Sequence, residues 1–252
     1  MFNHLHPVLA SVMTSAMSRP PLQAAAVTIV FAALARLLNG VTRAGALAGA
    51  VVSFAIYACA GPGAFAALVM VFVIAVLTTR IGYTRKQKLG AAESRQGRSA
   101  VQILANAGVA AVACILFAIL RDSTFLLAAA AALAEAAADT AASEVGEALN
   151  ERARLITTFQ PVAAGVNGGI TLSGTLAGAF ASCLVAGCGV VVHLISASGF
   201  WLVSAAGFVG MLLDSLLGAV LENRSLLNND TVNLLGTLSA ALIALLLARV
   251  LV

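Results

Sequence analysis

The feature that most constrains this chain is a run of acidic residues inside an apolar segment long enough to span a membrane. The segment 124–148 reads TFLLAAAAALAEAAADTAASEVGEA, and it carries four carboxylates, Glu135, Asp139, Glu144 and Glu147. A charged side chain at the bilayer centre costs roughly 3 kcal/mol, so such groups normally face a protein interior, a cation or a water-filled cavity. In a helix, Glu135, Asp139, Ser143 and Glu147 form one stripe, and Glu144 lies about a third of a turn away. The stripe predicts a site whose oxygen atoms hold a hard cation.

The composition defines the class of protein. Apolar residues make up 61% of the 252 residues and charged residues only 10%, whereas a soluble domain carries about 25% charged residues. The mean hydropathy is +1.03. We therefore expect an all-α, polytopic transmembrane helical bundle. With about 20 residues per span, the chain accommodates about eight spans, at 21–38, 44–60, 63–81, 99–119, 124–148, 170–192, 199–221 and 232–252. Residues 1–20 are interpreted as an N-terminal lead-in, and residues 21–252 as a single transmembrane domain.

The basic residues predict the orientation in the membrane. Of the 14 Lys and Arg residues, 11 fall in four connections that an eight-span bundle places on one side, namely Arg36, Arg43, Arg80, Arg85, Lys86, Lys88, Arg95, Arg98, Arg152, Arg154 and Arg224. The positive-inside rule puts this side in the cytoplasm and both termini outside. We expect an integral protein of a bacterial inner membrane with a cytoplasmic site. The charges are dispersed over loop ends without interleaved aromatic residues, which argues against a nucleic-acid partner.

Polar motifs gather at the same expected side. GRSAVQILANAG repeats polar residues every four positions at the start of the fourth span, Arg98, Gln102 and Asn106. The connection before the sixth span reads LITTFQPVAAGVNGGITLSG and supplies Thr157, Thr158, Asn167, Gly168, Gly169, Thr171 and Ser173. The amides of a Gly-rich turn and of a helix N-terminus suit a phosphate group. No GxxxxGK[ST] motif is present, so this is not a Walker A loop.

Two further motifs follow near the C-terminus. GMLLDSLLGAVLEN places Asp214 between Gly210 and Gly218 at four-residue spacing, which lets a neighbouring helix approach a lone acid. NNDTVN precedes the last span, where Asn228, Asn229 and Asp230 are typical of helix caps and Asn233 lies one turn inside. Glycines in membrane helices usually serve packing, but a buried carboxylate such as Asp139 or Asp214 favours a functional role.

Taken in order, these segments resemble a known family. GRSAVQILANAG, ADTAASEVGE, LITTFQPVAAGVNGGITLSGTLAG, GMLLDSLLGAVLE and NDTVN are similar to signature segments of the integral membrane family that includes transmembrane protein 19 and the phytyl-phosphate kinase of plants and cyanobacteria. The resemblance runs from about Arg43 to the C-terminus. It implies an NTP-dependent kinase, with CTP as the preferred nucleotide, that converts a prenyl monophosphate to the diphosphate.

The residues and the resemblance together suggest roles. Mg²⁺ accepts one or two carboxylates and leaves its other positions to water and phosphates, and we expect Asp139, Glu144 and Asp214 to hold it. Lys88 and Arg98 would contact nucleotide phosphates, with the amides of residues 167–171. The remaining candidates for nucleotide or phosphate binding are Asn106, Thr157, Thr158, Asn167, Gly168, Gly169, Thr171, Ser173, Asn229, Asp230 and Asn233. The expected partners are membrane lipids, the prenyl monophosphate and the nucleotide.

Two other classes remain open at this stage. An ion-coupled transporter or lipid flippase also uses intramembrane acids and glycine-interrupted helices, but its site should lie near the midplane. The polar motifs here lie at one end of the spans, which favours a soluble nucleotide meeting a lipid headgroup. The third alternative is a structural member of the same family without activity.

Overall fold

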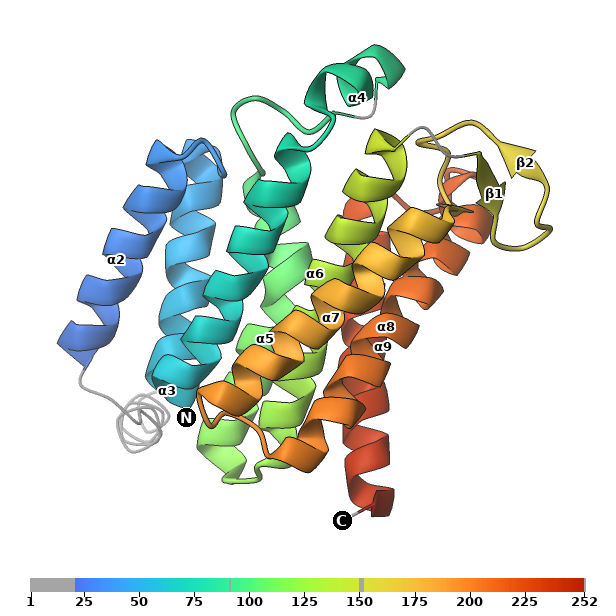
Figure 1. The fold of residues 1–252 in the computed structure, drawn as a ribbon. Coiled ribbons are helices and arrows are strands. Elements are labelled where there is room, and N and C mark those ends of the chain that lie inside the picture. The colour runs from blue at the N-terminus through green and yellow to red at the C-terminus, as the bar shows by residue number, and fades with distance from the viewer. Residues whose placement is uncertain (1–20, 91, 150–151, 252) are drawn as a thin grey trace, which may run out of the picture.

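The fold is a bundle of long apolar helices with a small polar cap at one end (Figure 1). The computed structural model describes residues 21–90, 92–149 and 152–251, so the expected lead-in at 1–20 lies outside the described residues. The helices are α2 (Pro21–Leu37), α3 (Arg43–Arg80), α4 (Tyr83–Leu89), α5 (Ala100–Leu120), α6 (Thr124–Ala148), α7 (Leu172–Val191), α8 (Ala197–Leu217), the π-helical turn η2 (Gly218–Glu222) and α9 (Asn229–Leu251). The predicted all-α class is confirmed.

Helix α3 is two antiparallel arms joined by a sharp bend. Gly61 has φ 81° and ψ −172°, which only glycine adopts without strain, and Pro62 starts the second arm. The rings of Tyr57 and Phe65 meet edge to face across the bend, 5.5 Å apart. Six described helices are long and apolar enough to cross a membrane by length and composition. Taking the two arms of α3 separately and adding the shorter α2 gives eight apolar segments, in agreement with the expected number.

Helix α6 occupies the centre of the bundle. It packs against α3, α5, α7, α8 and α9, and its alanine run 128–132 is fully buried. Small residues let neighbouring backbones approach closely in a membrane bundle. The approach is tight: a Cβ atom on Gly174 of α7 would lie 2.5 Å from the carbonyl oxygen of Ala142, and one on Gly207 of α8 would lie 2.8 Å from Cβ of Ala134. The alanine-rich acidic segment is therefore the core of the fold.

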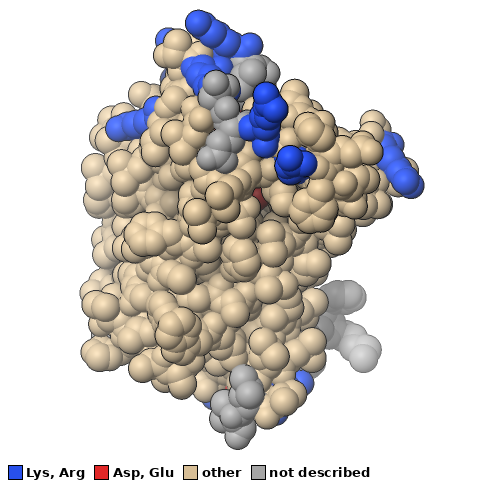
Figure 2. All heavy atoms as spheres, turned by 45° about the vertical axis from the view of Figure 1, so that its right-hand side comes forward, with Lys and Arg blue, Asp and Glu red and all other residues tan. Residues whose placement is uncertain are grey.

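The connections of the bundle define a basic end. The Thr42 amide, at the start of α3, donates to the Arg98 carbonyl oxygen at 3.0 Å, which ties the α2–α3 turn to the segment before α5. Helix α4 and the strands lie at this same end, and both described chain ends lie at the opposite end (Figure 1). Figure 2 shows Lys and Arg side chains gathered there, with an acidic side chain visible in a hollow among them. The basic connections therefore lie together at this end of the bundle, as the charge pattern predicts.

A three-stranded antiparallel sheet was not expected from the sequence. Strands β1 (Ala153–Leu155), β2 (Pro161–Val162) and β3 (Gly169–Ile170) have the order β2-β1-β3, and Arg154 pairs with Pro161 on one side and Ile170 on the other. Strands of two or three residues are too short to produce a detectable alternation of apolar and polar residues. The sheet fixes the Gly-rich loop between β2 and β3 as an ordered structure.

Candidate active site

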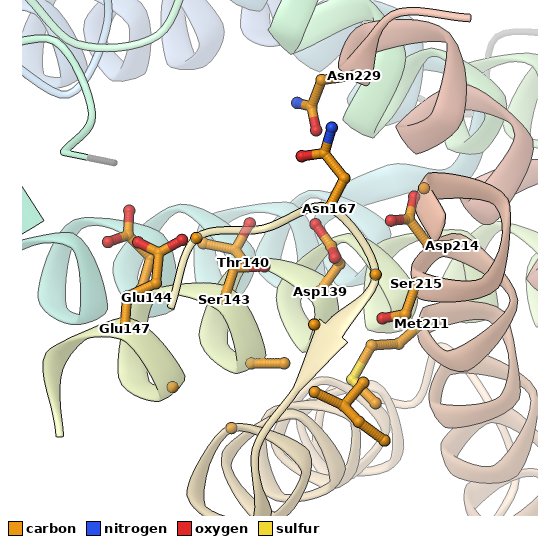
Figure 3. Close-up of a pocket in the computed structure, with 18 of the residues that line it drawn as sticks. Asp139, Thr140, Ser143, Glu144, Glu147, Asn167, Met211, Asp214, Ser215 and Asn229 are labelled. Atoms are coloured by element: carbon orange, nitrogen blue, oxygen red, sulfur yellow. The ribbon is translucent and has the colours of Figure 1, made fainter. Parts of the chain in front are cut away.

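A polar cavity of about 290 Å³ opens at the basic end. It lies between α5, α6, α8, α9 and the Gly-rich loop 164–171, and most of the polar motifs of the sequence contribute to its wall. The predicted site residues that line it are Asp139, Glu144, Asp214, Arg98, Asn106, Asn167, Gly168, Gly169, Thr171, Asn229 and Asn233. Figure 3 shows Asp139 and Asp214 projecting toward this cavity from different helices, with Asn167 and Asn229 nearby.

Two carboxylates, Asp139 and Asp214, face the cavity, and neither forms a salt bridge with another residue in the described part of the chain. Asp139 comes from the second half of α6, beside the hydroxyl groups of Thr140 and Ser143, and Asp214 comes from α8, beside Ser215. Asp214 is 7% exposed, and its Oδ2 atom has no hydrogen-bond partner among the described residues. A buried carboxylate oxygen without a partner is costly unless a cation or a proton supplies one. The donor set of carboxylates and hydroxyls is the hard-oxygen type that Mg²⁺ prefers.

The Gly-rich loop lies against the π-helical turn. Gly168 has φ +75°, and a Cβ atom there would come within 2.7 Å of the Ala219 backbone, so only glycine fits. The side-chain amide of Asn223 donates to the Asn167 carbonyl oxygen at 3.0 Å, which holds the loop in place. Thr171 then caps α7 by accepting from the Gly174 amide at 3.0 Å. The loop thus brings a glycine turn and a helix N-terminus to one wall of the cavity.

Arg98 forms another wall. It precedes a capping box in which the Ser99 hydroxyl accepts from the Gln102 amide and the Gln102 side chain accepts from the Ser99 amide. Its Nη2 atom donates weakly to Thr140 Oγ1 at 3.4 Å, and its Nε atom lies 3.9 Å from Glu93 Oε2. These long contacts, the ones the structure gives between Arg98 and other described side chains, leave most of the five guanidinium N–H donors for an anion.

Glu144 belongs to a buried ion pair and not to an open metal site. Its Oε2 atom contacts Nζ of Lys86, and its Oε1 atom accepts from the Thr79 hydroxyl at 2.7 Å. Lys86 is fully buried and also donates to the Thr79 carbonyl oxygen at 2.9 Å. Among the described residues, no group of three or more His, Cys, Asp or Glu side chains is placed to hold a metal ion. The expected set of Asp139, Glu144 and Asp214 is not among such groups, and Glu144 is ion-paired to Lys86.

Five predicted site residues lie outside the cavity wall. Lys88 is exposed on α4, and Thr157 and Thr158 are exposed at the turn between β1 and β2, because the unexpected sheet carries that turn away from the cavity. The other two are near its rim. Ser173 lies beside the Thr171 hydroxyl at 3.4 Å, and Asp230 lies in the first turn of α9. The cap of that helix is Asn228, whose Oδ1 accepts from the Thr231 amide at 2.9 Å.

Several residues that line the cavity are not among the predicted site residues. Thr140 and Ser215 each follow a predicted acid directly, so their adjacency in the chain was an available signal. Glu222 lies eight residues after Asp214, at the end of the π-helical turn η2 that follows α8, and also lines the cavity. Lys86 gave no such signal, because the sequence does not indicate which lysine of a basic loop turns inward.

Glu135 lies deeper than the cavity and faces Asp214. It is 1% exposed, and its Oε1 atom has no hydrogen-bond partner among the described residues. A Cβ atom placed on Gly236 of α9 would lie 2.5 Å from this Oε1 and 2.9 Å from Oδ2 of Asp214. Two unpartnered carboxylate oxygens therefore meet at one glycine where α6, α8 and α9 cross.

The fold, its apolar outer surface and its buried polar cavity define an integral membrane helical-bundle protein. The chain belongs to the family described as Integral membrane protein DUF92, whose model matches residues 26–241. The family resemblance drawn from the motifs is thereby confirmed.

Named relatives come from several organisms. The chain is 37% identical over 186 residues to the uncharacterized membrane protein MJ0933 of Methanocaldococcus jannaschii, covering 71% of this chain and 74% of the relative. It is 34% identical over 195 residues to the uncharacterized membrane protein sll0875 of Synechocystis, covering 75% and 76%. It is 27% identical over 222 residues to the chloroplastic protein VTE6 of Arabidopsis thaliana, covering 84% and 67%. No solved structure matches the chain.

Proposed function

We propose that this protein is a membrane kinase that transfers the γ-phosphoryl group of a nucleoside triphosphate, with CTP preferred, to a prenyl monophosphate. The observation that carries the proposal is the meeting of Asp139, Asp214, Arg98 and the Gly-rich loop around one cavity at the basic end. Phosphoryl transfer needs charge neutralisation and positioning of the reacting oxygens, and little covalent work from the protein. The kinase family implied by the sequence motifs, and the similarity to VTE6, support the same reaction class.

Each set of cavity residues would have its own role in binding the nucleotide, the metal ion or the phosphate oxygens. The amides of Gly168 and Gly169 and the N-terminus of α7 would receive the nucleotide phosphates, because backbone N–H groups and a helix dipole favour negative charge. Asp139 and Asp214 would hold Mg²⁺, which when bound neutralises phosphate charge. Arg98 would bind phosphate oxygens through its planar guanidinium group. Lys86 keeps Glu144 paired, so that this carboxylate does not repel the incoming anions.

The reaction balances without a general base. A monoester oxygen of the acceptor attacks the γ-phosphorus, the new P–O bond forms, and the bond from the γ-phosphorus to the β–γ bridging oxygen breaks. The nucleoside diphosphate leaves with that electron pair, and the prenyl group becomes a diphosphate ester. The acceptor is already anionic at neutral pH, so no side chain has to remove a proton.

The orientation follows from the charge distribution. By the positive-inside rule we propose that the basic end faces the cytoplasm, where nucleoside triphosphates are found. The cavity at that end receives a soluble nucleotide, and the bundle beside it receives a lipid acceptor.

The test uses purified protein in detergent with Mg²⁺, each nucleoside triphosphate and a panel of prenyl monophosphates. Mass spectrometry should detect a prenyl diphosphate that depends on both the nucleotide and Mg²⁺. If folded protein yields no diphosphate with any member of the panel, the kinase proposal is wrong.

An ion-coupled carrier is the second candidate, because one observation favours it. The unpartnered oxygens of Glu135 and Asp214 meet in the interior of the bundle, and transporters place ion-binding carboxylates at helix interfaces. Proteoliposomes distinguish the two functions. A carrier should move a prenyl phosphate across the bilayer in response to a Na⁺ or H⁺ gradient without nucleotide, and the kinase should not.

A further inference from the structure

A second cavity, of about 390 Å³, lies on the other side of Arg98. It is lined by α2, the two arms of α3, α5 and the segment 93–98. Its wall is mainly apolar, with Phe31, Leu68, Val71 and Phe72 among the side chains that form it. Its volume falls within the range of small-molecule pockets, about 300–1,000 Å³. A nucleotide base and sugar would lose hydrogen bonds to water here without replacing them, so the occupant has to be apolar.

The mouth of this apolar cavity is basic. Arg80, Arg95 and Arg98 line it where it approaches the basic end, next to Tyr83. An apolar body ending among three guanidinium groups matches a hydrocarbon chain that carries a phosphate, since Arg recognises phosphate oxygens through paired N–H donors.

The two cavities share part of one wall. Glu93, Arg98 and Asn106 line both the polar cavity and the apolar one. A phosphate bound to Arg98 would therefore have its hydrocarbon chain in the apolar cavity. The same phosphate would face the nucleotide in the polar cavity. This juxtaposition is what an in-line transfer between a soluble donor and a lipid acceptor requires.

The geometry points to the apolar cavity as the binding site for the prenyl chain of the acceptor, with the acceptor phosphate at Arg98. The inference rests on the proposed kinase function and adds the location of the acceptor. The chain is held inside the protein, between α2, α3 and α5, and not in the bulk bilayer.

A glycine in the wall offers a direct test. A Cβ atom on Gly49, in the first arm of α3, meets no atom within 4 Å, so a leucine there extends into the cavity. Gly108 of α5 is the matched control, because its Cβ position is equally open and it lines neither cavity. Both substitutions replace a helical glycine by the same residue, and both should favour the helix slightly. Thermal unfolding of both variants checks that they fold.

The two KM values distinguish an effect on acceptor binding from an effect on nucleotide binding. Gly49→Leu should raise KM for the prenyl monophosphate about 10-fold or more, as a filled hydrophobic pocket does, and leave KM for the nucleotide unchanged. Gly108→Leu should change neither. Equal acceptor KM values in the two variants would overturn the assignment of the cavity.

A second measurement needs no variant and no turnover. A prenyl monophosphate with a benzophenone on its chain is irradiated with wild-type protein, and the labelled peptides are identified by mass spectrometry. Labels should fall within 31–52, 68–79 and 103–107, and excess prenyl monophosphate should compete, but not the prenyl alcohol or a bulk phosphatidylethanolamine. Labels on the outer, lipid-facing surface, or equal competition by the phospholipid, would overturn the inference.

The experiments distinguish failure of the acceptor-site inference from failure of the kinase proposal. Competed labelling in the cavity without any diphosphate product would leave the binding site standing and remove the kinase function. Diphosphate formation with labels elsewhere would leave the kinase standing and remove this acceptor site.

Discussion

Removing the charge of Glu144 should destabilise the fold before it affects any chemistry. Lys86 is fully buried, and its ammonium group contacts Glu144 and two backbone carbonyl oxygens of α3, those of Thr79 at 2.9 Å and Thr78 at 3.4 Å. In the variant Glu144→Gln, that ammonium group stays buried without its salt-bridge partner. Breaking one side of a buried ion pair costs about 3–5 kcal/mol. For a chain of this size, that free energy corresponds to a fall in Tm of about 10 °C.

The assay is thermal unfolding in detergent, followed by circular dichroism at 222 nm. The double variant Lys86→Met with Glu144→Leu removes both charges, and it should recover most of the lost stability, because a buried pair can often be replaced by apolar residues at little cost. The single variant Lys86→Met should be as destabilised as Glu144→Gln. If Glu144→Gln keeps the wild-type Tm while Mg²⁺-dependent turnover falls, Glu144 is a metal ligand and the ion-pair assignment is wrong.

Three other predictions concern the deep acid, the Gly-rich loop and the orientation. Glu135→Gln should reduce turnover less than the loss of a cavity acid does and keep or raise Tm, because it removes a buried charge; loss of turnover equal to that of Asp214→Asn would favour the carrier. Gly168→Ala should raise KM for the nucleotide and speed proteolysis in the loop, since the alanine would collide with Ala219; unchanged values would separate the loop from nucleotide binding. Single cysteines near Lys88 and Arg224, in a background without the native cysteines, should react with impermeant reagents only in opened cells.

The fold was largely predictable because its determinants are local. Twenty-residue apolar segments, the Gly61–Pro62 break and the clustering of basic residues are all legible in the chain, and the structure follows them. The central position of α6 also follows from its alanine run, since small side chains with embedded acids suit the interior of a bundle. The sheet of 153–170 was missed because its pairing is set by contacts across the loop.

The cavity was predictable by motif, but not residue by residue. Asp139, Asp214, Arg98 and the Gly-rich loop, which come from four separate motifs, line one cavity. Lys88 and Lys86 differ by two positions on one short helix, and which of them turns inward depends on the packing of α4 against α6. Glu144 then becomes the partner of Lys86, although its sequence context matches that of a metal ligand. Lys86 and Glu144 are 58 residues apart in the chain. A tertiary contact therefore decides both which lysine is buried and which carboxylate is paired.

The most direct test of the account follows the phosphoryl group itself. A nucleoside triphosphate labelled with ¹⁸O on the non-bridging γ-oxygens is supplied with Mg²⁺ and a prenyl monophosphate to wild-type protein, Asp139→Asn and Asp214→Asn. With wild-type protein, we expect the label to appear in the terminal phosphate of the prenyl diphosphate. Both variants should lose about 100-fold or more in turnover with a Tm at or above that of wild type. Unlabelled or absent diphosphate from folded wild-type protein, or full turnover in both variants, would contradict it.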